Sequence, residues 1–515
     1  MPNHQVLIVG AGPTGLVLAL WLTHLGVKVR LIDKLAQSGT TSRALAVQAR
    51  TLEFYQQLGL AQAVVDRGHK VPALNLWVRG RKAATVPIQK IGQGLSAFPY
   101  PMIFPQDEHE RLLIERLRAL GIEAERQVEL VGFEDDGQEV RATLRKSDGS
   151  EEKCRAFYLA GCDGARSKIR EVLNVGFPGG TYDHLFYVAD VEAAGPPMDG
   201  GLHVDLDDAD FLAVFPLKGM GRARLIGSVR DEAAKDAERL KFEDIQDRAI
   251  RNLKIEVKRL NWFSTYRVHH RVADAFGKGR TYLLGDAAHI HSPVGGQGMN
   301  TGIGDAVNLA WKLASVLNDK SSAALLDSYE PERIKFARRL VATTDRIFSG
   351  VINPSVLARI VRTKAVPGIA PVLFKLPAVR RFAFRTVSQL AVNYRGSACS
   401  CGEAGKVQGG DRLPWVEFAG APDNFAALKT LKWQLHIYGQ PNAEINASCA
   451  ERGLQLQSFS WQPACQHAGL LRDAAYLVRP DGYVALADPQ ASAQKLTQYF
   501  QTRGIQVTPS ATKVI

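Results

Sequence analysis

The first glycines and acids that could do chemistry lie near the amino terminus. An apolar run, residues 6–9, precedes Gly10, Gly12 and Gly15, and Asp33 follows Gly12 by 21 residues. Such glycines allow a tight turn from a strand into a helix, whose first N–H groups favour phosphate oxygens. A carboxylate at the end of the next strand accepts hydrogen bonds from ribose hydroxyls. The pattern predicts an adenine dinucleotide site and leaves NAD and FAD both open.

A second glycine-rich stretch follows nearly 280 residues later. A buried strand over residues 281–284 stops at Gly285 and Asp286, and residues 295–298 supply three more glycines before a helix. FAD has a ribityl chain and an isoalloxazine ring, which NAD lacks. Asp286 can hold the ribityl hydroxyls, and N–H donors of the loop can face the flavin edge where negative charge gathers on reduction. The second stretch therefore favours FAD.

Three motifs in this order resemble those of the class A FAD-dependent aromatic monooxygenases, the p-hydroxybenzoate hydroxylase and phenol hydroxylase group. They are GAGPTG with Asp33, YLAGCDGARSKIRE at residues 158–171, and LLGDAAHIHSPVGGQGMN at residues 283–300. The resemblance covers about residues 1–395. The chain departs from it at Cys162, where the family usually has alanine or glycine, and this change is small.

The resemblance implies which residues bind the cofactor. Arg43 and Pro293 would act at the flavin, and Asp163 with Arg166 and Arg170 would contact both FAD and the pyridine nucleotide. Two alternatives remain: Arg43 in a surface salt bridge, and Asp163 as a helix cap. The implied cofactor-binding residues are Gly10, Gly12, Pro13, Thr14, Gly15, Asp33, Lys34, Arg43, Gln106, Val128, Asp163, Asp286, Gly296, Gly298, Met299 and Asn300.

The predicted fold class is α/β, with a Rossmann-type FAD-binding domain, an inserted antiparallel substrate sheet and a thioredoxin-like C-terminal domain. Alternating apolar residues over 181–270 favour antiparallel strands. Candidate substrate residues are His203, Phe211 and Phe215, with Tyr187 beside them, although aromatic residues on strands are usually core. The predicted domains are 1–180 and 271–395 for FAD, 181–270 with 72–100 for substrate, and 396–515 at the C-terminus.

The stretch NYRGSACSCGEAGKVQGGDRLPW, residues 393–415, is rich in glycine and small polar residues and is predicted to be a linker. The small α/β domain expected after it has no C-x-x-C motif, so a structural or dimerising role is favoured over thiol chemistry. A homodimer stays an open alternative.

Several other functions are disfavoured. Six unpaired-looking cysteines in a chain of 515 residues indicate a reducing, cytoplasmic location. Residues 6–27 are apolar enough to span a membrane, but their glycines and Pro13 suit a strand and helix better. His289 and His291 lack a third metal ligand nearby.

The net charge of +12 is concentrated in one segment. Residues 331–395 hold thirteen Lys/Arg and only two Asp/Glu. No nucleic-acid motif accompanies this charge. Solvated helix faces are favoured, and a surface for an anionic membrane or an acidic partner is the alternative.

The resemblance implies hydroxylation of a phenolic or aromatic substrate with O2 and NAD(P)H through a flavin C4a-hydroperoxide. NADH or NADPH would bind transiently, because no second nucleotide loop is evident. Alternatives are a same-fold enzyme acting on a polycyclic polyketide or antibiotic, including Baeyer–Villiger oxidation, a membrane-associated isoprenoid or quinone hydroxylase, and a non-catalytic FAD binder. A halogenase is disfavoured because no tryptophans form W-x-W.

Overall fold

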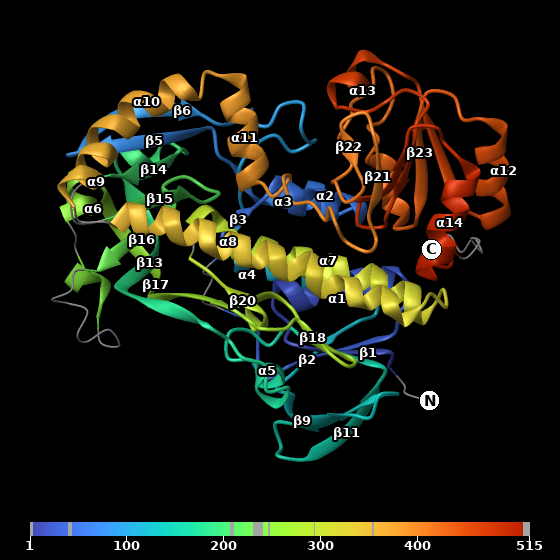
Figure 1. The fold of residues 1–515 in the computed structure, drawn as a ribbon. Coiled ribbons are helices and arrows are strands. Elements are labelled where there is room, and N and C mark those ends of the chain that lie inside the picture. Colours follow the sequence, from blue (N-terminus) through green and yellow to red (C-terminus); the bar gives the residue numbers. More distant parts are fainter. Residues whose placement is uncertain are drawn as a thin grey trace.

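The computed structural model describes residues 4–39, 44–206, 211–229, 240–245, 248–292, 294–352 and 355–507. These residues form an α/β unit, an eight-stranded sheet beside it, a layer of helices and a separate C-terminal unit (Figure 1).

A six-stranded sheet in the order β18-β19-β12-β1-β2-β8 forms the centre of the α/β unit. Neighbouring strands from β19 to β8 pair in parallel. Its strands are buried on both faces, as their continuous apolar sequences require. They are β1 (Val6–Val9), β2 (Val29–Asp33), β8 (Ala124–Arg126), β12 (Tyr158–Gly161), β18 (Gly277–Lys278) and β19 (Thr281–Leu283).

Helices α1 and α7 pack against each other beside this sheet, and both are buried along most of their length. A small three-stranded sheet of β9 to β11 hangs from the unit's far end (Figure 1). The helices are α1 (Pro13–His24), α4 (Gln106–Ala119), α5 (Lys168–Val172), α7 (Gly298–Leu317) and α8 (Tyr329–Ile352). The small strands are β9 (Glu129–Asp135), β10 (Val140–Arg145) and β11 (Glu151–Ala156).

The eight-stranded sheet has the order β20-β17-β13-β16-β15-β14-β5-β6. All neighbours are antiparallel except β14 and β5. Its strands are β5 (Ala73–Val78), β6 (Arg81–Pro87), β13 (Gly179–Ala194), β14 (Leu202–Asp205), β15 (Leu212–Pro216), β16 (Arg222–Val229), β17 (Glu256–Val272) and β20 (His289–Ile290), with α6 (Arg248–Asn252) on the outer side.

Short elements connect the two sheets, and a helical layer covers one end. The connecting elements are β3 (Ala46–Val47), α2 (Ala49–Gln57), α3 (Ala61–Arg67), β4 (His69–Lys70) and β7 (Met102–Ile103). The layer consists of α9 (Val356–Ile360), a π-helical turn, α10 (Val366–Leu373) and α11 (Pro377–Val387), which arch over the eight-stranded sheet (Figure 1).

The C-terminal unit has its own six-stranded sheet, in the order β22-β21-β26-β25-β23-β24, and its own core. Its elements are β21 (Cys401–Ala404), β22 (Val407–Gln408), β23 (Gln434–Tyr438), α12 (Ala443–Arg452), β24 (Gln455–Phe459), α13 (Pro463–His467), β25 (Ala475–Val478), β26 (Val484–Asp488) and α14 (Ala493–Arg503).

The predicted linker is wrong in its middle part. Residues 401–408 form the hairpin of β21 and β22, and β21 pairs with β26. Gly402 and Gly405 have positive φ values of 75° and 65°, so these glycines shape a strand and its turn. Glycine content alone could not separate a hairpin from a linker.

Candidate active site

The first glycine turn is closed by backbone contacts that only glycine allows. Gly10 has φ +105°, and a Cβ atom there would lie 2.2 Å from the carbonyl oxygen of Cys162. A Cβ atom at Gly15 would lie 1.9 Å from the carbonyl oxygen of Gly10. At Gly12, by contrast, no described atom comes within 4 Å of the added Cβ. This open side of the turn is where a pyrophosphate can approach the start of α1, next to Pro13.

Asp33 is the last residue of β2, and its carboxylate stabilises the glycine turn between β1 and α1. Its carboxylate accepts hydrogen bonds from the N–H groups of Ala11 at 2.7 Å and Leu35 at 2.8 Å. Arg126, paired with Asp33 across β2 and β8, brings Nη1 to 3.5 Å from the carboxylate. The N–H of Val128 donates to the carbonyl of Asp33 at 3.0 Å. Lys34 is exposed beside this corner.

The second glycine stretch lies directly against the first. Thr14 of α1 fills the space next to both Gly285 and Gly302: Cβ atoms at these glycines would lie 2.7 Å and 2.4 Å from its hydroxyl oxygen. Gly285 has φ +58°, and Asp286 follows it in a short turn with its side chain exposed. The two stretches therefore form one continuous edge, although Gly15 and Gly285 lie 270 residues apart in the chain.

Asn300 fixes the loop at the start of α7. Its amide donates to the carbonyls of Ala46 at 2.9 Å and Gly296 at 2.7 Å, and its oxygen accepts from the N–H of Gln48 at 2.8 Å. A Cβ atom at Gly296 would lie 2.5 Å from the Cβ of Ala46. Asn300 is fully buried, so its side chain braces the loop. Gly298 and the half-buried Met299 stand at the first turn of the helix.

Several buried polar atoms along this edge lack a hydrogen-bond partner among the described residues. They are Nη2 of Arg126, Nε2 of His291 and the hydroxyl of Ser292. Burial lowers the pKa of His291 to about 4, so its ring is neutral at pH 7. Unmet polar atoms in the protein interior are costly unless a ligand satisfies them. Their spread from the Asp33 corner to the second loop fits a long, polar cofactor such as FAD.

The Asp163 region connects the motifs through a helix cap. Asp163 accepts hydrogen bonds from the hydroxyl of Ser167 at 2.6 Å and the N–H of Ile169 at 3.2 Å. Arg170 donates to the carbonyl of Ala287 at 2.8 Å, and burial lowers its pKa. The capping alternative for Asp163 is therefore present in the structure, and a role in contacting cofactor stays a prediction. Arg166 is exposed.

Three further predicted residues lie around the same edge. Gln106 begins α4, and its N–H donates to the carbonyl of Ala44 at 3.0 Å, next to the predicted Arg43. Its amide nitrogen donates to Glu110 at 2.8 Å, and burial raises the pKa of this glutamate. Arg43 and Pro293, the two residues predicted to be catalytic, lie outside the described residues.

The eight-stranded sheet has two faces with different neighbours. On the inner face Phe215, Trp262 and Tyr266 pack, together with Ala46 of β3, against one apolar cluster. Phe211 lies on the same face by strand alternation and, like Tyr266, packs against the cluster of Phe186 and Val268. On the outer face Tyr187 packs in the core around α6.

His203 belongs to the outer face. It pairs across the strands with Val214 of that core, and its ring accepts from Trp77 Nε1 at 2.9 Å and contacts Asp199 at 2.7 Å. Burial is the main reason that its pKa is lowered. The structure therefore places Phe211 and Phe215 on one face of the sheet, and His203 and Tyr187 on the other.

Arg224 was not anticipated from the sequence. It pairs across the strands with Phe215, is fully buried, and donates to Asp190 at 2.6 Å and 2.7 Å. Its guanidinium carbon lies 5.7 Å from the ring centroid of Trp262. Strand alternation from Phe215 could have placed it on the inner face, but nothing in the sequence marks it as buried.

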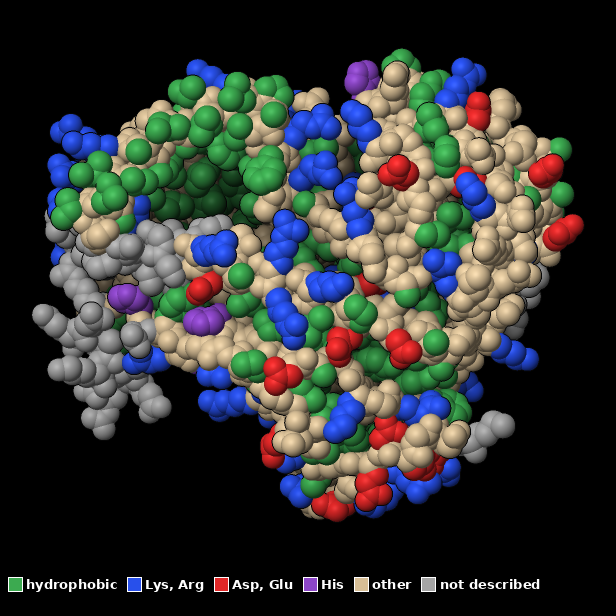
Figure 2. Space-filling view, in the orientation of Figure 1, with side chains coloured by type: hydrophobic (Ala, Val, Ile, Leu, Met, Phe, Trp, Pro, Cys, Tyr) green, Lys and Arg blue, Asp and Glu red, His purple; other side chains and the backbone are tan. Residues whose placement is uncertain are grey.

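A hollow opens between the inner face and the helical layer. Figure 2 shows it at the upper left, lined by hydrophobic side chains. Phe374, just after α10, packs against the inner face, and Phe384 of α11 packs with Ala49, Ile91 and Leu95. In the described part of the chain no group of three or more His, Cys, Asp or Glu residues could hold a metal ion. His289 instead contacts Asp305 at 2.7 Å.

This site and fold are those of a flavoprotein, and the chain belongs to the FAD binding domain family, whose model matches residues 3–344. It is an FAD-dependent aromatic monooxygenase, the class for which NAD(P)H is the typical reductant. None of the helices within the described ranges is long and apolar enough to cross a membrane.

Known proteins are similar over nearly the whole chain. The 6-methylpretetramide 4-monooxygenase of Streptomyces rimosus is 34% identical, over 96% of this chain and 93% of that protein. Pentachlorophenol 4-monooxygenase of Sphingobium chlorophenolicum is 29% identical, over 85% of this chain and 81% of its own. The structure of the OxyS anhydrotetracycline hydroxylase of Streptomyces rimosus superimposes with a TM-score of 0.78 at 27% identity, covering 98% of this chain and 100% of that one.

Proposed function

We propose that this enzyme hydroxylates a phenolic ring that is part of a fused-ring aromatic molecule, of the kind that polyketide chemistry makes. The observation that carries the proposal is the wide apolar hollow between the inner face of the eight-stranded sheet and the helical layer (Figure 2). Aromatic side chains on both walls suit a flat, extended ring system, because stacked and edge-on ring contacts add to apolar burial.

The relatives support a fused-ring substrate over a single ring. Relatives named for 6-methylpretetramide and anhydrotetracycline align over 96% and 97% of this chain, whereas the pentachlorophenol enzyme aligns over 85%. A rifampicin monooxygenase also aligns over 96%. Phenol hydroxylation without fused rings is the second candidate, and the pentachlorophenol relative supports it.

FAD, when bound, supplies the redox chemistry, taking electrons from NAD(P)H and activating O2. Asp33 and Arg126 would hold it at the ribose end, the open side of Gly12 would face the pyrophosphate, and His291 with Ser292 would hold it near the ring. The apolar hollow excludes water from the reacting atoms. The predicted peroxide route of oxygen transfer stays a prediction.

Arg224 is the group that we propose orients the substrate. It is fully buried and pairs with Phe215 across the strands, so it would act by holding the aromatic rings of this face in place, with its guanidinium carbon 5.7 Å from the ring centroid of Trp262. Asp190 holds the guanidinium in place at 2.6 Å. Replacing Arg224 with Met is expected to raise KM with little change in NAD(P)H oxidation without substrate. The matched control is Arg222→Met, which changes an exposed arginine on the same strand.

We also propose that the C-terminal unit is thioredoxin-like. A strand, helix and parallel strand (β23, α12, β24) are followed by an antiparallel hairpin and a helix (β25, β26, α14), in the order β26-β25-β23-β24. All six cysteines of the chain are free. Burial raises the pKa of Cys449 to about 11, which disfavours its thiolate and supports a structural role.

The test measures NADH and NADPH oxidation by the purified yellow protein with two panels of compounds, single-ring phenols and three- or four-ring phenols. Product and peroxide are quantified together, and ¹⁸O2 labels the inserted oxygen. We expect a fused-ring compound to stimulate oxidation and to gain one labelled oxygen per NAD(P)H used. Labelled product from single-ring phenols alone would replace the proposal with the second candidate. No labelled product from either panel would overturn both.

A further inference from the structure

The α9–α11 layer exposes far more apolar side chain than the rest of the chain. Eleven of the sixteen large hydrophobic residues that are exposed in the described part of the chain lie between residues 356 and 387. They are Val356, Leu357, Ile360, Val361, Val366, Ile369, Val372, Leu373, Leu376, Phe382 and Val387. Clustered exposed apolar residues mark an interaction surface, whereas scattered ones are ordinary.

The same surface is strongly basic. From Val356 to Val387 the sequence contains seven Lys or Arg residues and no Asp or Glu. Lys364, Lys375 and Arg381 are exposed. Figure 2 shows hydrophobic side chains over the helices at the upper left and basic side chains along the neighbouring helices. A protein partner that carries both acidic and basic groups would be matched by a surface with charges of both signs. The α9–α11 layer carries positive charges only.

Both kinds of residue share one side of the helices. Thr363, Pro367, Ala370 and Phe374, spaced by three or four residues, are the less exposed positions and turn toward the body. Leu357, Val361, Lys364, Val372 and Lys375 are exposed. An apolar face with basic residues among its exposed positions is the pattern of a helix that lies in the interface of an anionic bilayer.

We propose that the α9–α11 layer docks this enzyme on the surface of an anionic lipid membrane. The apolar residues enter the boundary between headgroups and acyl chains, and the basic residues bind the lipid phosphates. This is peripheral binding and needs no spanning helix.

The position of the α9–α11 layer suggests that membrane docking serves substrate entry. Phe374 follows α10 and packs against the inner-face cluster, and Phe384 of α11 packs with Ala49, so the layer lies directly over the sheet beside the hollow in Figure 2. An apolar aromatic substrate partitions into bilayers and could therefore enter the hollow from the lipid side. Only this delivery rests on the proposed function; the docking itself is independent of the substrate.

The test is flotation of the full-length protein, without substrate, with vesicles of phosphatidylcholine alone or mixed with phosphatidylglycerol. We expect binding to the anionic vesicles that is roughly ten-fold stronger than to neutral ones and falls as salt is raised. One variant carries Leu357→Gln, Ile369→Gln and Val372→Gln, and another carries Lys364→Glu, Lys375→Glu and Arg381→Glu. Each is expected to lower the bound fraction by about ten-fold.

The control variant is Leu120→Gln with Leu471→Gln, which changes exposed apolar residues elsewhere and should bind like the parent protein. NAD(P)H oxidation without substrate should be the same in all variants, which shows that each is folded and holds FAD. The proposal would be overturned if the wild-type protein bound neither kind of vesicle, or if the layer variants bound anionic vesicles as well as the wild-type protein does. Self-association that both layer variants abolish, without vesicle binding, would make the layer an interface between copies of the chain.

Discussion

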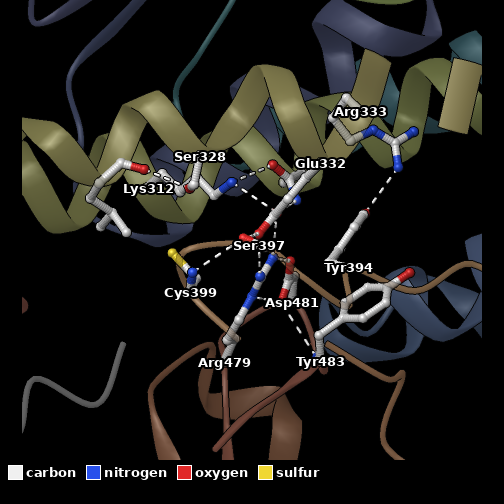
Figure 3. A network of polar contacts seen from close by, with 12 residues as sticks. Lys312, Ser328, Glu332, Arg333, Tyr394, Ser397, Cys399, Arg479, Asp481 and Tyr483 are labelled. Atoms are coloured by element: carbon white, nitrogen blue, oxygen red, sulfur yellow. Dashed lines mark hydrogen bonds and ion pairs between the residues drawn. The ribbon is translucent and has the colours of Figure 1, made fainter. Parts of the chain in front are cut away.

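Two regions cover the FAD-binding unit, and they are attached to it in opposite ways. The C-terminal unit meets α7 and α8 through a seam of buried charges, shown in Figure 3. Arg479 donates to Glu332 at 2.8 Å and 3.1 Å, and Lys312 donates to the same carboxylate at 2.9 Å. Asp481 accepts from the Trp311 ring nitrogen at 3.1 Å. The charged residues of this seam are at most 1% exposed.

The α9–α11 layer is attached by apolar contacts and a few amides. Phe384 is the buried anchor of α11. Just after α11, Gln389 donates to the Gln297 side-chain oxygen at 2.8 Å and to the Thr301 hydroxyl at 3.0 Å. Gln297 donates to the carbonyl of Val387 at 2.7 Å. The layer thus contacts the start of α7 and the loop before it directly.

The difference indicates different tasks. A buried ion pair tolerates little movement, because separating the partners leaves uncompensated charge. Apolar contacts at a surface allow a region to shift while it stays attached. We infer that the seam makes the C-terminal unit part of the fixed architecture, whereas the layer is the side through which molecules reach the site.

The largest effect is expected from Arg479→Met at the seam. It leaves Glu332 and Asp481 buried with one cation fewer, and should lower the free energy of unfolding by about 3–5 kcal/mol. Urea unfolding followed by circular dichroism measures this. The control Arg395→Met breaks a half-exposed pair with Asp411 and should cost at most about 1 kcal/mol. Equal effects of the two changes would contradict a fixed seam.

The seam also predicts how stability depends on pH. Burial alone would raise the pKa of Glu332, but Arg479 and Lys312 hold it well below its usual range. A lowered folded-state pKa stabilises the fold above the unfolded value of about 4.3 and loses that contribution as the pH falls. The parent protein should therefore lose stability from about pH 5 downward. In Arg479→Met this loss should be shallower, because the carboxylate gains less from its neighbours.

The central elements of the fold could be predicted because local sequence dictates them. The strand over residues 6–9 and the helix after the glycine turn are where the pattern predicts them. Gly10 and Gly15 lie where other backbone atoms come too close for a side chain, so glycine is required there and the sequence pattern shows it. The same logic failed at residues 401–408, because hairpin glycines and linker glycines have the same composition.

The site was only partly predictable, because much of it depends on pairing between distant segments. Arg126 reaches Asp33 only through the register of β2 and β8, and Arg224 is buried only because β15 and β16 pair. His203 illustrates the converse. Its type suggested a substrate contact, but a shift of one position along a strand changes the face on which a side chain lies.

Within the layer, Phe384→Ala is expected to have the next largest effect. Phe384 is 5% exposed, and its ring lies where a Cβ atom at Gly92 would be, 2.0 Å from Cε1. Removing the ring should lower stability by about 3 kcal/mol and admit water to the hollow, so a larger share of NAD(P)H oxidation should yield peroxide. Phe382→Ala, at 73% exposure on the same helix, is the control and should change neither quantity.

A smaller effect is expected from Gln389→Ala. The change removes two hydrogen bonds to the loop at the start of α7 and leaves the Gln297 oxygen with one donor fewer, at a cost of about 1–2 kcal/mol. Because that loop borders the flavin site, FAD affinity should fall, and titration of the apoprotein by flavin fluorescence measures it. Asn393→Ala changes an exposed amide nearby and should leave the affinity unchanged. Unchanged affinity in Gln389→Ala would mean that the layer and the loop act separately.

The smallest effect is expected where the sequence looks most apolar. Leu357→Gln, Ile369→Gln and Val372→Gln should each change the free energy of unfolding by no more than about 0.5 kcal/mol, because these side chains are already in water. Folding therefore gives no reason for apolar residues at these positions, and a role in binding does. If thermal unfolding showed losses as large as that of Phe384→Ala, the side chains would have to be packed against another surface, and the contrast between a fixed seam and an open layer would fail.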